Sequence, residues 1–193
     1  MPTSADDVLD FWFGPRDGAA PLQARDAWFR KDPDFDRAIR GRFGAAVEDA
    51  LAGGLQAWDA SAEGALARIL LLDQFTRNAY RDTPRAFAGD AAALACARAL
   101  VEDWRDLPLV PMQRWFVYMP FEHAEDAAAQ DESVRLFTAL AQAAPGFEGA
   151  LDYALRHRDV IRRYGRFPHR NAILGRESTA EERNYLSQPG AGF

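Results

Sequence analysis

Apolar side chains recur along the chain at intervals of three and four residues, the spacing that an amphipathic α-helix requires. Phe35, Ile39, Phe43 and Val47 illustrate the pattern, since each follows the last by four positions. Alternating runs of β-branched residues, which would indicate strands, do not occur. The pattern predicts an all-α protein of about eight helices packed in antiparallel pairs.

Capping residues indicate where these helices begin and end. Ser, Thr and Asp side chains accept backbone N–H groups at a helix start, whereas Gly or Pro marks an end. The predicted helices are as follows: Thr3 or Ser4 to Phe13, Pro33 to Leu51, Ser61 to Asn78, a helix after Pro84 that carries Leu94 and Trp104, Pro111 to Tyr118, one through Val134 and Leu140, and Phe147 to Tyr164.

Two local signals refine this assignment. Pro120 has no N–H group, so it is predicted to kink or interrupt the helix that starts at Pro111. A capping box, either Ser178 with Glu181 or Thr179 with Glu182, predicts a short final helix.

Composition places the chain among ordinary globular proteins. Its 193 residues are 48% hydrophobic and 27% charged, which suits a single domain over residues 1–193. The net charge of −6 argues against a nucleic-acid or anionic-membrane surface, because both require a basic face. Cys96 lies at an apolar helical position and is expected to be a small buried hydrophobe.

The N-terminal residues contain no basic segment followed by an apolar run, and no stretch reaches the ~18 apolar residues of a membrane helix. We therefore expect a cytoplasmic protein with no membrane partner.

A first polar cluster lies at the end of the third predicted helix. At about 100° per residue, Asp73, Gln74, Arg77 and Asn78 share one side of that helix. Asp73 and Arg77 are four residues apart and can form an ion pair. The cluster is either a partly buried ion pair that closes a helix end or a group that faces a ligand.

A second cluster follows Pro120. His123 lies between Glu122 and Glu125, which is typical of an acid–base group with a raised pKa, of part of a metal site, or of a helix-end histidine bonded to its neighbours. His157 faces inward on the seventh predicted helix, where it is either a core histidine or a ligand-facing one. All three histidines of the chain lie in polar segments.

The third cluster occupies residues 165–177, a connection predicted to be non-helical. Connections of this length usually bind something or are mobile. Its side chains offer planar donors suited to carboxylate or phosphate groups; they are Arg166, His169, Arg170, Asn171 and Arg176. Alternatively, these arginines satisfy helix-end carbonyls and nearby acids such as Glu122 and Glu125.

These segments carry a resemblance that covers almost the whole chain. The sequence resembles a bacterial family known as domain of unknown function 924, through Asp10–Gly14, Leu72–Asn78, Tyr118–Glu125 and Tyr164–Asn171. Thr76 departs from the family pattern, which usually has proline at this position. The departure affects only where the local helix is expected to end. The resemblance implies a tetratricopeptide-like α-α superhelix and implies no activity.

The leading hypothesis is a polar pocket, without a cofactor or metal, that binds a small anionic molecule. Its predicted ligand-binding residues are Asp73, Gln74, Arg77, Asn78, Arg166, Arg170 and Asn171. Helical superhelices also present grooves to peptides, so a protein-interaction scaffold is the second hypothesis. Exposed aromatic residues among Trp28, Phe29, Trp58, Trp104 and Trp115 would favour it.

A hydrolase or lyase that uses histidine and carboxylate acid–base chemistry is the third hypothesis, and whether the protein is an enzyme stays open. The candidate catalytic residues are Glu122, His123, Glu125, His157 and His169. The same histidines with a carboxylate also have the ligand types of a zinc or iron site. Their wide separation in the sequence and the arginine-rich segment nearby argue against a metal.

Overall fold

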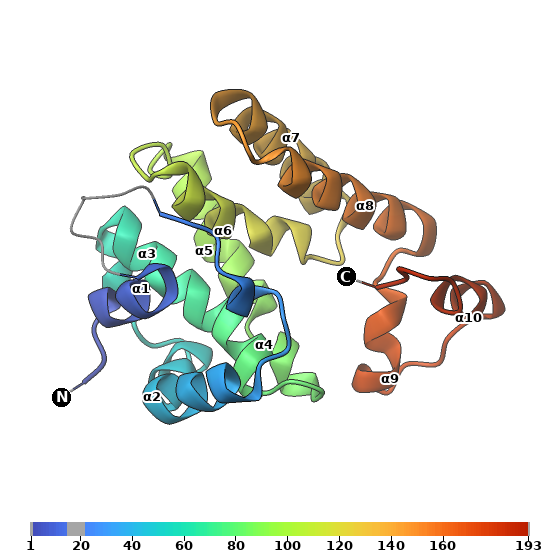
Figure 1. The fold of residues 1–193 in the computed structure, drawn as a ribbon, viewed down its shortest axis with the longest axis horizontal. Coiled ribbons are helices and arrows are strands. Elements are labelled where there is room, and N and C mark those ends of the chain that lie inside the picture. The colour runs from blue at the N-terminus through green and yellow to red at the C-terminus, as the bar shows by residue number, and fades with distance from the viewer. Residues whose placement is uncertain (1, 15–21, 193) are drawn as a thin grey trace. The chain divides into compact units, whose positions relative to one another are not determined.

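The computed structural model describes residues 2–14 and 22–192, and in these ranges every regular element is a helix (Figure 1). The all-α prediction is confirmed. Among the described residues, no helix is long and apolar enough to cross a membrane.

Contacts between residues divide the chain into two compact units. Unit 1 extends up to Arg81 and includes Arg85–Pro120, and unit 2 comprises Asp82–Pro84 and the chain from Phe121 onward. The single domain over residues 1–193 stays a prediction.

The helices of unit 1 follow the predicted order. They are α1 (Ala5–Phe13), α2 (Pro33–Leu51), α3 (Ala62–Ile69), a π-helical segment (Leu70–Phe75), α4 (Thr76–Ala79), α5 (Asp90–Glu102) and α6 (Pro111–Glu122), whose last two residues belong to unit 2. Short 3₁₀ helices lie at Asp26–Trp28, Gln56–Ala60 and Pro84–Phe87.

Predicted caps fix the starts of these helices. Ser4 accepts a hydrogen bond from the Asp7 N–H group and forms a capping box with it. Asp32 caps α2 and Ser61 caps α3 through their side-chain oxygens. Each cap satisfies a backbone donor that the helix itself leaves without a partner.

Aromatic rings fill the core of unit 1. Trp12 has no exposed surface and stacks on Trp28, with ring centroids 5.6 Å apart and an interplanar angle of 12°. Phe116 meets Trp28 edge to face at 4.8 Å. Such pairs contribute about 0.5–1.5 kcal/mol each beyond the area they bury. The aromatic core therefore joins α1 to α6.

The third predicted helix differs from a continuous α-helix. α3 ends at Ile69, and the π-helical segment Leu70–Phe75 follows before α4 begins at Thr76. A π-helix is wider than an α-helix and shifts the direction of the side chains that follow it. The prediction of one α-helix from Ser61 to Asn78 is therefore wrong within the stretch that carries Asp73.

Gly89 lies directly against this π-helical segment. A Cβ atom at Gly89 would overlap the carbonyl oxygen of Leu72. The absence of a side chain at Gly89 thus lets α5 start next to the wider helix.

Of the kink or interruption predicted at Pro120, the interruption is wrong. Pro120 lies inside α6, which continues to Glu122. Proline removes one backbone hydrogen bond here, the bond to the carbonyl four residues earlier. Because α6 ends two residues later, that loss falls in its last turn.

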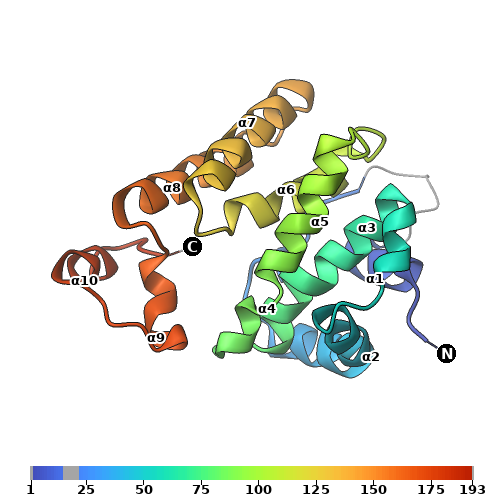
Figure 2. The ribbon, with the colours of Figure 1, turned by 180° about the vertical axis from the view of Figure 1, so that it is seen from behind.

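Unit 2 is built around a pair of long helices. α7 (Ala127–Ala143) and α8 (Glu148–Tyr164) lie side by side in both views (Figure 1, Figure 2). Gly165 ends α8 in the left-handed conformation at φ 70°, as predicted for its C-cap. α10 (Ala180–Leu186) begins with the capping box of Thr179 and Glu182, the second of the two predicted pairs.

The connection between α8 and α10 contains short helices that were not predicted. Residues 165–177 contain a 3₁₀ helix, Pro168–Arg170, and a single-turn helix, α9 (Asn171–Leu174). Phe167 is fully buried and packs with Val160 and Ile161. The non-helical prediction for this segment is wrong, because apolar anchors fold it onto α8.

Candidate functional site

The polar cluster of unit 1 is centred on Arg77. Its Nη1 atom lies 3.1 Å from Asp73 Oδ1, so the predicted ion pair forms. The guanidinium also donates to both carboxylate oxygens of Asp90, at 2.8 and 3.2 Å. The Asp73 side chain is 1% exposed, so Arg77 neutralises a carboxylate that water cannot solvate.

The other two predicted residues of this cluster have different partners. Gln74 donates from Nε2 to Asp73 Oδ2 at 2.6 Å. Asn78 donates instead to Asp36 Oδ1 at 2.8 Å, and Asp36 also accepts two hydrogen bonds from Arg81. The predicted single face is therefore divided between two acids.

Charge and burial act in opposite directions on Asp36. Burial raises the pKa of its carboxyl group, but hydrogen bonds from Arg81 and Asn78 outweigh burial and hold the pKa below its ordinary value. Asp36 is thus ionised and paired in the folded protein.

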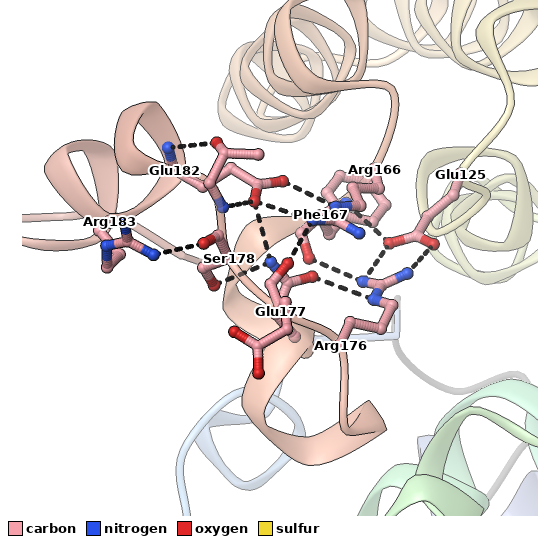
Figure 3. A network of polar contacts seen from close by, with 10 residues as sticks. Glu125, Arg166, Phe167, Arg176, Glu177, Ser178, Glu182 and Arg183 are labelled. Carbon is pink, nitrogen blue, oxygen red and sulfur yellow. Dashed lines mark hydrogen bonds and ion pairs between the residues drawn. The ribbon is translucent and has the colours of Figure 1, made fainter.

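In unit 2 the predicted arginine cluster forms two ion pairs (Figure 3). Arg166 reaches Glu182 with Nε at 2.7 Å and Nη2 at 2.9 Å. Arg176 reaches Glu125 with Nη1 at 2.6 Å and Nη2 at 2.9 Å. Both pairs have the fork geometry in which arginine binds carboxylates best. They fit the alternative in which the arginines satisfy nearby acids.

Backbone and amide groups complete this network. Glu125 Oε1 accepts the Phe167 N–H group at 2.7 Å. Asn171 donates to Ser178 Oγ at 3.0 Å and to Glu182 Oε2 at 3.3 Å, and it accepts from Arg176 Nε at 3.0 Å. Arg166 and Asn171 therefore hold the ordered connection in place.

The hydrogen bonds in this network explain the two acids' titration. The Arg166 guanidinium, with the Thr179 N–H group, lowers the pKa of Glu182 to about 2. Burial raises the pKa of Glu125, but the hydrogen bonds from Arg176 and from the Phe167 N–H group outweigh burial. The pKa of Glu125 is therefore below its ordinary value.

The remaining predicted residues of unit 2 surround His157. Its Nδ1 atom lies 2.8 Å from the Tyr153 carbonyl oxygen, which can only accept, so Nδ1 carries the proton. Glu122 Oε1 lies 3.6 Å from the same nitrogen, and both side chains are less than a tenth exposed. The His123 ring centroid is 6.3 Å from that of His157.

Phe167 joins His157 to the rest of this group. Its ring meets His157 edge to face at 5.5 Å and lies 5.6 Å from the His169 ring. The Arg170 guanidinium carbon is 4.6 Å from the Phe167 ring centroid, and Arg170 Nη2 donates to the His123 carbonyl at 3.0 Å. The structure thus gathers all three histidines of the chain in unit 2.

The electrostatic surroundings keep His157 neutral. Burial, followed by the charge of His123 and then of His169 and Arg170, lowers the pKa of His157 to about 2.

Gln130 is a residue that the sequence prediction missed. Its Nε2 atom donates to the carbonyl oxygens of Phe121, Glu122 and Ala124, at 3.3, 2.6 and 2.9 Å. Gln130 has no exposed surface. The signal was present, because a glutamine on the buried side of a helix needs partners. It fixes the chain on both sides of His123.

Within residues 2–14 and 22–192, no three His, Cys, Asp or Glu side chains are placed to hold a metal ion. The arrangement of histidines therefore does not support the zinc or iron alternative. Cys96 is buried, as predicted, and burial raises the pKa of its thiol to about 12.

The predicted site residues thus fall into two groups in different units. Asp73, Gln74, Arg77 and Asn78 lie in unit 1, and the group from Glu122 to Asn171 lies in unit 2. Within unit 2, the Glu122–Glu125 segment and the Arg166–Asn171 segment do meet. A single pocket that joins both groups stays a prediction.

Comparison with known proteins places this fold. A model of a family described as bacterial proteins of unknown function, DUF924, matches residues 8–190. A solved structure of a protein of unknown function from Agrobacterium tumefaciens is 42% identical, covers 95% of this chain and 96% of that chain, and superposes with a TM-score of 0.81. An α-α superhelix is consistent with this similarity. No curated protein matches the sequence.

Proposed function

The chain belongs to the DUF924 family of bacterial proteins, and we propose that its unit 2 binds a small anionic molecule at a histidine cluster. The cluster consists of Glu122, His123, His157, His169 and Arg170. One observation carries the proposal: every histidine of the chain and a buried arginine gather around one buried, neutral imidazole.

The cationic groups of the cluster support an anion, whereas the Glu122 carboxylate opposes one. His157 loses its proton partly because His123, His169 and Arg170 repel a further positive charge. An anion placed among these groups would offset that repulsion and favour protonation of the histidines. Anion affinity should therefore rise as the pH falls, because each protonated histidine adds positive charge to the cluster.

Other predicted residues act indirectly in this proposal. Arg166 and Asn171 bind Glu182 and so position the connection that carries His169 and Arg170. The unit 1 residues Asp73, Gln74, Arg77 and Asn78 are bonded among themselves and to Asp36 and Asp90. Their contacts fit a structural role in unit 1 better than a share in this cluster.

The low pKa of His157 favours binding over acid–base catalysis. A general base works best when its pKa lies near the working pH. The pKa of His157, about 2, gives its imidazole little tendency to take up a proton at neutral pH. Hydrolase or lyase chemistry therefore draws less support from this residue than binding does.

Thermal melts with a panel of anions test the proposal. We expect phosphate, sulfate or a dicarboxylate to raise Tm more at pH 6 than at pH 8, relative to chloride at equal ionic strength. Arg170→Gln should remove the shift. Arg162→Gln is the matched control, because Arg162 is an arginine of the same unit that lies half exposed on α8. An equal shift in both variants would contradict a site at the histidine cluster.

A protein-interaction role is the second candidate, and the exposure of aromatic side chains favours it. Trp104 is 71% exposed and Phe29 is 55% exposed, whereas Trp28 is buried. Trp58 and Trp115 are partly buried. Large exposed aromatic side chains are the commonest anchors of protein interfaces.

A further inference from the structure

Trp104 occupies a position that normally belongs to glycine. It follows the C-terminal end of α5 with φ 57°, in the left-handed region. Trp104 N–H donates to the Val101 carbonyl at 3.1 Å, and Arg105 N–H donates to the Leu100 carbonyl at 2.9 Å. These two bonds are the Schellman motif, whose left-handed residue is usually glycine because a bulky side chain is unfavourable there.

Burial does not compensate for this conformation. Trp104 is the most exposed large hydrophobic residue among those described, and its neighbours Leu107 and Val110 are also exposed, at 52% and 46%. All three lie within the connection between α5 and α6. Trp104 therefore contributes little to folding through burial while its backbone carries strain, a combination that points to another use.

The same connection is held firmly from its inner side. Arg105 Nη2 donates to the Asp59 carbonyl at 2.6 Å, and Asp106 accepts the Tyr118 hydroxyl at 2.6 Å. Leu109 is buried. Inward residues thus alternate with the outward Trp104, Leu107 and Val110. A surface fixed in this way loses little conformational entropy when a partner binds.

The charge beside Trp104 is negative. Glu102 and Asp103 are exposed, and neither carboxylate forms an ion pair or hydrogen bond within the described part of the chain. The last turn of α5 contains no basic residue. The carbonyl end of the helix adds partial negative charge. A cationic side chain would gain from these charges and from the face of the tryptophan ring.

We propose that Trp104, Leu107 and Val110, with the carboxylates of Glu102 and Asp103, form a docking surface for a partner protein's segment in which arginine or lysine adjoins an apolar residue. The proposal names the partner class for the protein-interaction candidate. It is independent of anion binding in unit 2.

Charge distinguishes this occupant from two others. In a symmetric dimer the same patch faces itself, so Glu102 and Asp103 would approach their own copies. Like charges opposed in an interface weaken it. An anionic membrane would be repelled for the same reason. A basic apolar segment alone matches both the ring and the acids.

An array of short peptides tests this surface. The peptides combine leucine or phenylalanine with arginine, lysine or glutamate, and the probe is the fluorescently labelled full-length protein. We expect the arginine and lysine peptides to bind and the glutamate peptides not to bind. Trp104→Gly should weaken that binding by about tenfold or more, and it should raise Tm because glycine accepts the left-handed conformation.

Two further variants complete the test. The double variant Glu102→Gln, Asp103→Asn should bind the basic peptides several-fold more weakly, and its binding should depend less on salt. Tyr153→Ala, which removes another exposed aromatic ring from unit 2, is the control and should leave binding unchanged.

Three results would overturn the proposal. They are the absence of binding to any basic peptide, equal binding by Trp104→Gly, and a wild-type dimer that Trp104→Gly dissociates, which would assign the surface to a second copy. Thermal melts of Trp104→Gly with phosphate distinguish the two proposals. If phosphate still raises the Tm of this variant, anion binding at the histidine cluster stands even when the docking surface fails.

Discussion

Arg176 and Glu125 form a two-pronged ion pair although 51 residues separate them in the sequence. The two N–O distances are 2.6 and 2.9 Å, and Arg176 Nη2 also donates to the Phe167 carbonyl at 3.1 Å. Glu125 accepts the Phe167 N–H group in turn. The pair therefore clamps the backbone of Phe167 between the chain after α6 and the chain before α10 (Figure 3).

Glu125→Gln should destabilise the protein by about 1–2 kcal/mol, because an amide cannot accept both prongs of the guanidinium. Both side chains are about a quarter exposed, which limits the loss through solvent screening. Urea unfolding at pH 7 measures it. Glu132→Gln is the control: its pair with Arg135 is more exposed and should contribute less than about 0.5 kcal/mol. Equal losses would contradict the clamp.

The sequence predicted the cap at Ser61, the end of α8 at Gly165 and the capping box at Thr179, because each depends on residues within one helical turn. It did not predict the π-helical segment Leu70–Phe75. That segment depends on Gly89, which is distant in sequence and leaves room for it. Local propensity carries no signal of such a tertiary contact.

In the candidate site, too, local contacts were predicted from the sequence and contacts between distant segments were not. The Asp73–Arg77 pair follows from helical spacing and was predicted, whereas the second partner of Arg77, Asp90, comes from another helix. Sequence reasoning likewise proposed Glu122 and Glu125 as acids for the arginines. Glu125 pairs with Arg176 as proposed, whereas the partner of Arg166 is Glu182, an acid that was not proposed. Residue types predict the chemistry, but the fold selects the partner.

Gly89→Ala should destabilise unit 1 by about 2 kcal/mol or more, since the new Cβ atom would overlap the rigid Leu72 carbonyl. Gly41→Ala is the matched control. Gly41 lies in the interior of α2 with open space around its Cα, so alanine should stabilise the protein by about 0.5–1 kcal/mol. Thermal melts of the two variants should shift in opposite directions. A neutral Gly89→Ala would mean that the π-helical segment yields easily.

His157 should make the protein less stable as the pH falls. Its pKa is about 2 when folded, against 6.5 ordinarily, so between these values the unfolded chain binds the extra proton. The contribution of neutral His157 to the free energy of unfolding is therefore fully present above pH 6.5. Below pH 6.5 it declines by about 1 kcal/mol per pH unit. His157→Asn should flatten this decline between pH 6.5 and 5, as measured by urea unfolding. An imidazole NMR signal of His157 that titrates near pH 6.5 would contradict it.

Asp73→Asn tests whether the carboxylate under the π-helical segment is structural. The change leaves Arg77 with Asp90 as its charged partner, so we expect a loss of about 2–3 kcal/mol, below the 3–5 kcal/mol typical of a fully broken buried pair. Asp90→Asn should cost less, because that side chain is 19% exposed and water can replace part of its interaction.

The double variant decides how the two acids share Arg77. If they are coupled through the guanidinium, the combined loss in chemical unfolding should exceed the sum of the single losses, because only then does the partly buried arginine lack any carboxylate. Strict additivity would mean that water reaches Arg77 once either acid is gone. A stable Asp73→Asn variant would instead show that the carboxylate is kept at a cost to folding, and that would return Asp73 to the set of ligand-binding candidates.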